Sequence, residues 1–229
     1  MQRLKQSRVY KLLKWCFFSI IYFILKKIGI KNWKYYYSKW IVDDGENALL
    51  TKYPLGPEST VVDVGGYTGN FSDKIVSLYN PHLIIFEPVK RYYKILKNKY
   101  LNNKKVNVYN HGLSDKNSVQ KIYLSDDGTS LFKKSDRSEK IKLIDVSIFL
   151  KRFRSIDLSS INIEGAEYDV LKRLLETEQI KKIKFLQVQF HSFVPQADKK
   201  RRDIIKMMFK THRIHFSYRF VWESFKLKR

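Results

Sequence analysis

The sequence predicts an α/β fold: an open, mostly parallel sheet joined by helices, with a helical extension before it. Two observations support this prediction. From Gly45 onward, short β-branched runs alternate with amphipathic segments, as they do in parallel sheets whose strands are connected by helices. The chain has 229 residues, of which 44% are hydrophobic, enough for one domain and a modest extension. We therefore divide it into an extension, residues 1–44, and one domain, residues 45–229.

The extension is basic and aromatic. Its apolar segment, residues 15–25, ends at Lys26 and Lys27 and is well short of the roughly 20 apolar residues that span a bilayer. No small-residue cleavage site follows this segment, so it lacks the pattern of a secretory signal. We expect residues 1–30 to form a basic helix that can lie on an anionic membrane surface. A helix packed on its own domain or on a partner is the alternative.

The first half of the domain is predicted to contain three strands and two helices. The run STVVDV is short and β-branched, which is typical of a buried strand, and an amphipathic helix follows its glycine turn. The same order repeats in HLIIFE and VKRYYKILKNKYL, and KVNVYN is the next strand. The predicted strands are 59–64, 82–87 and 105–110, and the predicted helices are 71–79 and 89–101.

The second half begins with a polar excursion, QKIYLSDDGTSLF, in which we expect an ordinary hairpin turn around Thr129 and Ser130. A helical turn, a strand that runs through a glycine turn into a helix, another strand and a last helix follow it. The aromatic, alternating tail is predicted to form two short antiparallel strands that close the sheet edge. These segments are residues 147–153, 158–176, 183–193, 198–212 and 213–228.

The charge is strongly basic, with 45 Lys and Arg residues against 22 Asp and Glu residues and a net charge of +23. Such a chain attracts phosphates, anionic lipid headgroups and acidic glycans, and charge alone does not choose among them. The single cysteine, Cys16, cannot form an internal disulfide, so we expect a cytoplasmic protein that is peripheral at the inner face of a membrane. Cys16 has no Cys or His neighbours at metal-ligand spacing, and we predict no metal site.

The stretch VVDVGGYTGNFS places Asp63 at the end of a predicted strand, before a glycine turn and a helix that starts near Asn70. Such a turn brings backbone N–H groups and a helix N-terminus to the carboxyl edge of the sheet. Because glycine has no Cβ, a ligand can approach the backbone at Gly65 and Gly69. Taken alone, however, a glycine pair is more often a requirement of the turn than a cofactor loop.

Glu87 strengthens the cofactor interpretation. It ends the second predicted strand, in the place where an acidic side chain accepts hydrogen bonds from the vicinal hydroxyls of a ribose. The alternative is that Glu87 caps the helix that follows it. The glycines do not have the G-x-G-x-x-G spacing of a dinucleotide site, whereas S-adenosylmethionine, which has no phosphate, fits the turn better.

Five motifs in this order and spacing resemble the FkbM-like methyltransferases: VVDVGGYTGNFS, IIFEPVKRYYKIL, VYNHGLSD, INIEGAEYDVLKRL and LQVQFH. The resemblance extends from about residue 45 to residue 193, and its most specific part is FEP combined with I-x-I-E-G-A-E. It implies an S-adenosylmethionine-dependent O-methyltransferase. It also implies a Rossmann-like, seven-stranded, mostly parallel sheet with helices on both faces.

The resemblance further implies a set of site residues. The glycine turn would hold the methionine side of the cofactor, Glu87 would hold its ribose, and two residues beyond the third strand would lie near its adenine. Three residues at the ends of the next two strands would face the reacting methyl. In this order the residues are Asp63, Gly65, Gly66 and Gly69; Glu87; Ser114 and Asp115; and Asn162, Glu164 and His191.

Two departures from the family pattern concern catalysis. Where the family commonly has K-x-D-x-E-G, this chain has Ser160 and Asn162. Where the family often has E-x-H, Gln189 precedes His191. These changes do not threaten cofactor binding, but they argue against a metal-assisted or Asp-based mechanism.

Methyl transfer to an alcohol needs a base, because an alcohol is a poor nucleophile until its proton is removed. We predict that Glu164 is this base, that His191 orients the acceptor hydroxyl or shares its proton, and that Asn162 positions the substrate. The alternatives are that Glu164 complements the dipole of a helix that it begins, and that His191 is merely hydrogen-bonded in the core.

The leading functional hypothesis is O-methylation of a sugar hydroxyl on a glycan, polysaccharide or glycolipid, as the resemblance implies. The second is RNA methylation, suggested by the net charge of +23 and by the aromatic residues at 35–40, which can stack on bases. These aromatic residues lie in the extension, however, and not at the carboxyl edge of the sheet. A membrane-bound scaffold without turnover is the third hypothesis, suggested by Ser160 and Asn162.

Overall fold

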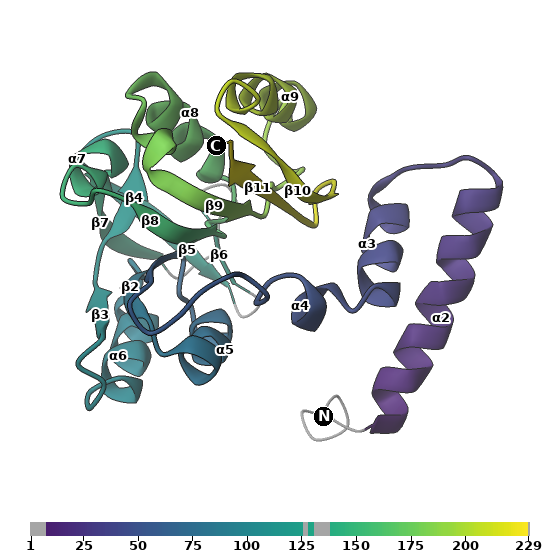
Figure 1. The fold of residues 1–229 in the computed structure, drawn as a ribbon, viewed down its shortest axis with the longest axis horizontal. Coiled ribbons are helices and arrows are strands. Elements are labelled where there is room, and N and C mark those ends of the chain that lie inside the picture. The colour runs from purple at the N-terminus through teal and green to yellow at the C-terminus, as the bar shows by residue number, and fades with distance from the viewer. Residues whose placement is uncertain (1–7, 126–127, 131–137, 229) are drawn as a thin grey trace.

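A seven-stranded sheet forms the centre of the computed structural model, which describes residues 8–125, 128–130 and 138–228 (Figure 1). The strand order is β10-β11-β9-β8-β1-β2-β3. The five strands from β9 to β3 run parallel, and β11 is antiparallel to both of its neighbours. The bounds are β1 Thr60–Val64, β2 His82–Phe86, β3 Val106–Tyr109, β8 Ile156–Ile161, β9 Ile183–Val188, β10 His212–Tyr218 and β11 Trp222–Leu227. The predicted fold class is confirmed, including the antiparallel pair at one edge.

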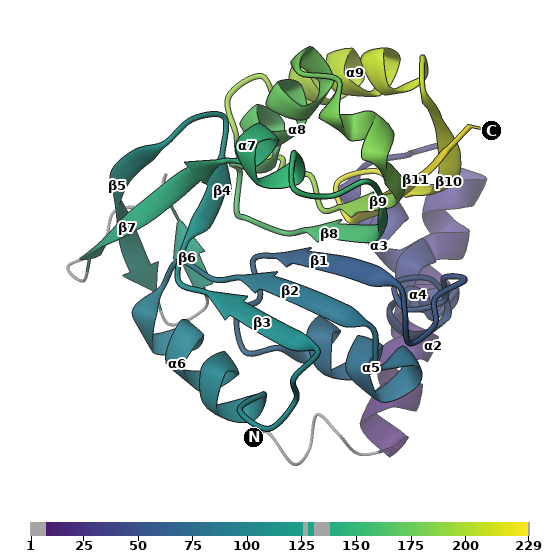
Figure 2. The ribbon, with the colours of Figure 1, turned by 60° about the vertical axis from the view of Figure 1, so that its left-hand side comes forward.

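Helices cover both faces of this sheet because its central strands are apolar on both sides (Figure 2). In β2, Leu83 and Ile85 belong to the core cluster that includes residues of α5 and α6. Ile84 and Phe86, which point the other way, belong to the cluster that includes residues of α7, α8 and α9. The bounds are α5 Asn70–Tyr79, α6 Lys90–Lys99, α7 Val146–Leu150, α8 Glu167–Glu176 and α9 Ala197–Met208, with a short 3₁₀ helix, η1, at Gln179–Lys182.

A second, four-stranded sheet follows β3 and lies to one side of β1, β2 and β3 (Figure 2). Its strands, in the order β4-β7-β5-β6, are β4 Gly112–Ser114, β5 Ser118–Ser125, β6 Gly128–Ser130 and β7 Ser138–Asp145. A hairpin is present as the pairing of β5 with β6, but Thr129 and Ser130, where we expected its turn, lie in strand β6. The connecting residues 126–127, and residues 131–137, lie outside the described residues. The sheet itself was not predicted. In the sequence, these strands alternate between apolar residues, such as the buried Ile122, Ile141 and Leu143, and polar residues. The lysines among the polar residues make this alternation hard to recognise.

The extension contains two antiparallel helices, and a short turn of helix follows it (Figure 1). α2 Arg8–Lys27 packs on α3 Trp33–Val42, which in turn contacts β10, and α4 Gly45–Ala48 leads into the domain. Trp40 anchors α3, since it is buried with its ring centroid 5.1 Å from that of Tyr218. Residues 1–7 of the predicted extension lie outside the described residues. Within the described part of the chain, no helix is both long and apolar enough to cross a membrane.

Candidate active site

A cavity of about 430 Å³ lies where the carboxyl ends of β1, β2 and β8 face the small sheet. Its inner wall, as we call it, belongs to the ends of these three parallel strands: Val64, Gly65, Phe86, Glu87, Asn162 and Glu164. Its outer wall belongs to the small sheet: Gly112, Leu113, Ser114, Gln120, Ile122, Ile141 and Leu143. The cavity is thus at the edge that the glycine turn and Glu87 indicate, but the sheet that closes it was not foreseen.

Gly65 sits at the tightest point of the inner wall. Its φ is +96°, and a Cβ at this position would lie 2.0 Å from the backbone carbonyl oxygen of Asn162. The backbone N–H groups of Gly65 and Gly66 both donate to the carbonyl oxygen of Phe86, at 2.9 and 3.1 Å. The turn after β1 is therefore fastened to the ends of β2 and β8, and only glycine fits there.

The other residues predicted around this turn lie behind the inner wall. A Cβ on Gly66 would lie 2.3 Å from the side chain of Ile85, and Gly69 begins α5 with a φ of +91°. Asp63 is buried, and its Oδ2 accepts a hydrogen bond of 2.6 Å from the Ser72 hydroxyl. Burial raises the pKa of the Asp63 carboxyl to about 6. None of the three lines the cavity, so the structure places them where they support the turn and the start of α5.

Glu87 both lines the cavity and organises the backbone around it. Its Oε2 accepts the N–H of Tyr67 at 2.8 Å, and its Oε1 accepts the N–H of Val89, which precedes α6, also at 2.8 Å. Glu87 therefore contacts the cavity and binds the N–H of the residue before α6, but it accepts no N–H of α6 itself in the hydrogen bonds of the described residues, so the helix-capping alternative is not what the structure shows. Glu87 is 4% exposed, and burial raises the pKa of its carboxyl to about 7.

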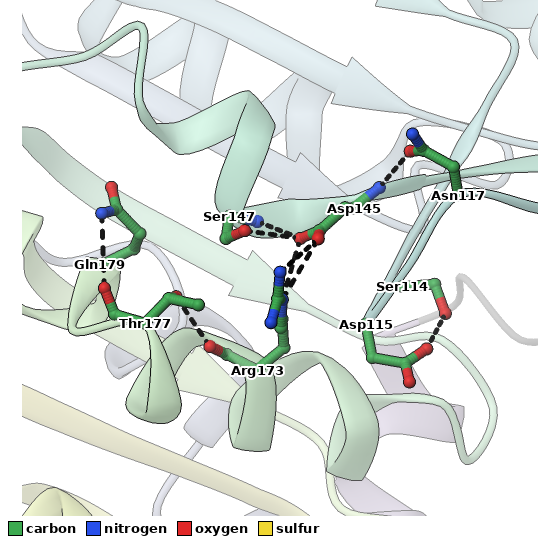
Figure 3. Close-up of polar contacts among 8 residues, drawn as sticks. All are labelled: Ser114, Asp115, Asn117, Asp145, Ser147, Arg173, Thr177 and Gln179. Atoms are coloured by element: carbon green, nitrogen blue, oxygen red, sulfur yellow. Dashed lines mark hydrogen bonds and ion pairs between the residues drawn. The ribbon is translucent and has the colours of Figure 1, made fainter.

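Ser114 of the outer wall and Asp115, the next residue, both line the cavity, and the Ser114 hydroxyl donates to Asp115 Oδ1 at 3.0 Å (Figure 3). Behind them Asp145, at the end of β7, accepts hydrogen bonds from Arg173 of α8 at 3.1 Å (Nε) and 2.7 Å (Nη2) (Figure 3). Burial raises the pKa of Asp145, but its hydrogen bonds with Arg173 and Ser147 outweigh this and hold the pKa below its usual value. This ion pair ties the small sheet to the main domain.

Glu164 lies in the turn between β8 and α8, not in a helix as its helix-dipole alternative required. Its φ is +51°, and α8 begins three residues later, at Glu167. The left-handed backbone at Glu164 and Gly165 turns the chain sharply and leaves the Glu164 side chain 43% exposed at the cavity. The helix-start prediction for Glu164 is therefore wrong, because the turn needs these residues outside the helix.

Glu167 is a site residue that the sequence analysis missed. It is fully buried, and its Oε2 accepts the N–H of Gly165 at 2.8 Å. Its Oε1 accepts the backbone N–H of His191 at 2.8 Å and lies 3.2 Å from His191 Nδ1. The sequence did contain a signal for this residue. Glu167 is the second glutamate of the I-E-G-A-E turn and lies on the apolar face of α8, where a buried carboxylate needs hydrogen-bond partners.

His191 lies between the two glutamates. It follows the end of β9 by three residues, where the prediction placed it in the strand. Its Nε2 is 3.7 Å from Glu164 Oε1, on the opposite side of the ring from Glu167. Burial lowers the pKa of the imidazole, but the hydrogen bond to Glu167 and the charges of both glutamates outweigh burial and raise it. His191 does not line the cavity, so Glu164 stands between it and the open space.

Asn162 completes the inner wall. Its backbone N–H donates to the carbonyl oxygen of Val64 at 3.0 Å, which fixes the residue at the cavity. Its side-chain Oδ1 is buried and has no hydrogen-bond partner among the residues that the structure describes. A buried acceptor without a partner is costly unless a bound molecule supplies the donor. Asn162 is therefore a lining residue whose side-chain oxygen lacks a hydrogen-bond donor among the described residues, and its role in substrate positioning stays a prediction.

The cavity has the opposite charge to the chain as a whole. Among the residues that the structure describes, the charged side chains of its lining are Glu87, Asp115, Glu164 and Asp169, with Lys116 as the one basic residue. This acidic lining and the apolar outer wall fit S-adenosylmethionine, which combines a sulfonium cation, an amino group, ribose hydroxyls and a flat adenine. No group of residues able to hold a metal ion occurs in the described ranges.

Comparison with protein families gives a match that covers most of the domain. The model of the methyltransferase FkbM domain matches residues 63–220. This range includes every residue of the inner and outer walls, together with Glu167 and His191. No curated protein sequence matches the chain.

Solved structures with a similar fold are distant in sequence. An rRNA methylase from Streptococcus thermophilus is 10% identical with a TM-score of 0.46, and the match covers 76% of this chain and 90% of that one. Methanococcus jannaschii fibrillarin, a pre-rRNA processing protein, is 7% identical with a TM-score of 0.47, over 77% and 70%. A methyltransferase candidate from Streptococcus mutans in complex with SAH is 10% identical with a TM-score of 0.43, over 76% and 91%. Similarities this distant say nothing about the acceptor of this chain.

Proposed function

The chain belongs to the FkbM methyltransferase domain family, and from this premise we propose that it methylates a sugar hydroxyl of a glycan, polysaccharide or glycolipid. It is a methyltransferase, and its methyl donor is S-adenosylmethionine. When bound, this cofactor supplies an electrophilic methyl group on a sulfonium. The choice of an oxygen atom, and of a sugar as its carrier, is the part that we propose.

The inner wall supplies the groups that would hold the cofactor. Glu87 would accept hydrogen bonds from the ribose hydroxyls through the lone pairs that Tyr67 and Val89 leave free. The unpaired Oδ1 of Asn162 would accept a hydrogen bond from a further donor. The apolar side chains of the outer wall would cover the adenine, and Ser114 and Asp115 offer polar contacts at its margin.

The arrangement of Glu164, His191 and Glu167 is the observation that carries the proposal of O-methylation. Glu164 faces the cavity and can take the proton of an acceptor hydroxyl. His191 Nε2, 3.7 Å behind it, can share that proton, while Glu167 holds the Nδ1 side of the ring. A histidine oriented by a buried carboxylate is the arrangement by which proteins prepare an imidazole to handle a proton. Such a relay is useful for an alcohol, which must lose its proton to react.

The acidic lining favours a sugar over RNA as the acceptor. Neutral hydroxyls donate hydrogen bonds to carboxylates, so Glu164 and Asp169 suit a hydroxyl-rich acceptor. The phosphodiester backbone of RNA would be repelled by these two carboxylates, and phosphate contacts dominate nucleic-acid affinity. The net charge of +23 therefore does not by itself make this cavity an RNA site.

Labelled S-adenosylmethionine provides the test. The protein is incubated with glycolipid, polysaccharide and RNA fractions of its source cells, and each fraction is scored for label, with Glu164→Gln as the paired control. Label that enters a carbohydrate fraction, depends on Glu164 and is recovered as a methyl ether supports the proposal. Label that enters RNA overturns it, and so does an absence of transfer to every fraction by protein that binds S-adenosylhomocysteine.

A further inference from the structure

The outward side of α2 is a continuous apolar stripe. Seven of its large apolar side chains are each 54–66% exposed: Val9, Leu12, Leu13, Phe17, Ile20, Phe23 and Ile24. The opposite side of the helix packs on α3, through ring contacts of Phe18 with Tyr37 and of Tyr22 with Tyr35. α2 therefore packs an aromatic side on α3 and leaves this apolar stripe exposed. α3 lies between α2 and the main sheet (Figure 1).

This stripe differs from the other exposed apolar residues of the chain. Leu78, Leu101 and Val119 are just as exposed, but they lie in three separate elements or turns, as single surface hydrophobics commonly do. The seven exposed apolar residues of α2 lie on one helix face and form a patch. An exposed apolar patch of this kind marks a surface that binds a partner or a membrane.

The charge around the stripe indicates what covers it. Residues 8–42 contain eight Lys and Arg residues and no Asp or Glu. Lys11, Lys26 and Lys27 are exposed on α2 itself, and two tryptophans of the hairpin, Trp15 and Trp33, are 46% and 50% exposed. Basic residues beside an apolar face with exposed tryptophan are the composition of helices that lie in a membrane interface.

We propose that the α2–α3 hairpin binds the surface of an anionic lipid bilayer, with the apolar stripe of α2 inserted below the headgroups. The absence of acidic residues from residues 8–42 is what selects this occupant. Anionic lipids neutralise these lysines, and each lysine at such a surface adds about a fivefold increase in binding. A second copy of the chain would bring another eight cations against the first eight, and the first carboxylate after them, Asp43 at the C-cap of α3, already pairs with Lys39 of its own chain.

Vesicle flotation with the full-length protein tests the proposal. We expect binding to vesicles that contain phosphatidylglycerol, weaker binding as salt shortens the Debye length, and little binding to phosphatidylcholine alone. The triple variant Phe17→Ser, Ile20→Ser, Phe23→Ser should lose at least about tenfold in binding. The matched control, Leu78→Ser, Leu101→Ser, Val119→Ser, removes equally exposed apolar side chains and should bind as the parent does.

A second pair of variants tests the electrostatic contribution to vesicle binding. Lys11→Glu, Lys26→Glu, Lys27→Glu should weaken binding to anionic vesicles by more than about tenfold, since three favourable charges are reversed. In the control Lys97→Glu, Lys199→Glu, Lys206→Glu, three exposed lysines outside the hairpin are reversed, and binding should change much less. Retained affinity for S-adenosylhomocysteine shows that each variant is folded.

Three results would overturn the proposal. One is equal binding to neutral and anionic vesicles, and another is undiminished binding by the Phe17, Ile20 and Phe23 triple variant. The third is a dimer in analytical ultracentrifugation that this triple variant abolishes, which would show that the stripe is an interface between two copies. Vesicle binding does not depend on methyl transfer, so the outcome is independent of the proposed function.

Discussion

The two walls of the cavity are built in different ways. The inner wall is made largely of backbone: Gly65 and Glu164 have positive φ, and both carboxylate oxygens of Glu87 accept main-chain N–H groups. The outer wall is made of side chains, chiefly Ile122, Ile141 and Leu143, which form a small core of their own with Val89 and Tyr92. The ion pair of Asp145 with Arg173 joins its sheet to α8, one of the helices that cover the main sheet.

The two walls therefore have different tasks: the inner wall fixes the reacting groups, and the outer wall adapts to the bound molecule. Backbone in a constrained turn cannot move to accept an added atom, so the inner wall holds reacting groups at fixed positions. Apolar side chains can repack around a changed neighbour at a modest cost. We therefore expect substitutions in the inner wall to remove binding or turnover, and substitutions that loosen the outer wall to change affinity only.

Gly65→Ala is expected to have the largest effect. Its Cβ would lie 2.0 Å from a backbone oxygen at a φ of +96°, so the turn must open. We expect the free energy of unfolding to fall by about 3 kcal/mol or more and the binding of S-adenosylhomocysteine to be lost. Thermal unfolding and calorimetry measure these two effects.

Gly56→Ala is the matched control, since nothing lies within 4 Å of the position of its Cβ. It should leave the free energy of unfolding within about 0.5 kcal/mol of the parent and cofactor affinity unchanged. If Gly65→Ala behaves like Gly56→Ala, the inner wall is not rigid and the comparison between the walls fails.

Glu164→Gln is expected to have the next largest effect. The amide keeps the shape of the side chain but cannot take a proton, so kcat should fall by about 10²–10⁴-fold. Affinity for S-adenosylhomocysteine should stay within about twofold, because the loss concerns the transition state. Steady-state kinetics with the identified acceptor, beside calorimetry, separates the two quantities.

Asp169→Asn is the control for Glu164→Gln, because Asp169 also lines the cavity but has no contact with His191 among the hydrogen bonds and ion pairs of the described residues. It should retain most turnover. Near-normal activity of Glu164→Gln would assign the base to His191, and equal losses in both variants would show a general effect of cavity charge.

Cofactor affinity should depend on pH through Glu87. Burial raises the pKa of its carboxyl to about 7, so the side chain is mostly neutral at pH 6 and mostly ionised at pH 8. Only the ionised form is a full acceptor for ribose hydroxyls, so affinity for S-adenosylhomocysteine should rise by about tenfold over this interval. The free energy of unfolding should depend on pH in the opposite direction. The stabilisation that Glu87 contributes is fully present below the ordinary glutamate pKa and is lost as pH rises through 7.

Calorimetry at several pH values in Glu87→Gln assigns the effect. The variant should bind weakly and with a flat pH profile. A pH dependence that survives in Glu87→Gln would have to come from another group, and Asp63, with a pKa of about 6, would be the first to examine.

Arg173→Ala is expected to have the smallest effect on the site. It removes the ion pair that holds the end of β7 against α8, while Ser147 and its backbone N–H keep their hydrogen bonds to Asp145. The KM for S-adenosylmethionine should rise by about threefold to tenfold with kcat within about twofold, because the outer wall loosens while the reacting groups stay in place.

Lys172→Ala, one residue earlier on α8, loses only an exposed i,i+4 pair with Glu176 and should change neither constant. A fall in kcat for Arg173→Ala as large as that for Glu164→Gln would show that the outer wall also takes part in the chemistry. The distinction between the two walls would then be wrong.

The main sheet and much of the inner wall could be predicted from local pattern. β1 and β2 are buried on both faces, so they appear as short apolar runs, interrupted in β1 by Asp63. Each is followed by the feature that marks the site, a glycine turn or Glu87. The I-E-G-A-E turn placed Glu164 at the same edge. Its helix start was predicted wrongly because left-handed backbone at a glutamate leaves no mark in the sequence.

The sequence by itself therefore determined the strand and helix order, the family and the carboxyl edge at which the cavity lies, because these depend on periodicity and on residues close in the chain. Only the tertiary structure decided the outer wall and the placement of Glu167 against His191. β4 pairs with β7 about thirty residues away, and Glu167 meets His191 24 residues further along the chain. Such contacts depend on which surfaces pack together in space, and no local pattern of residues reports that.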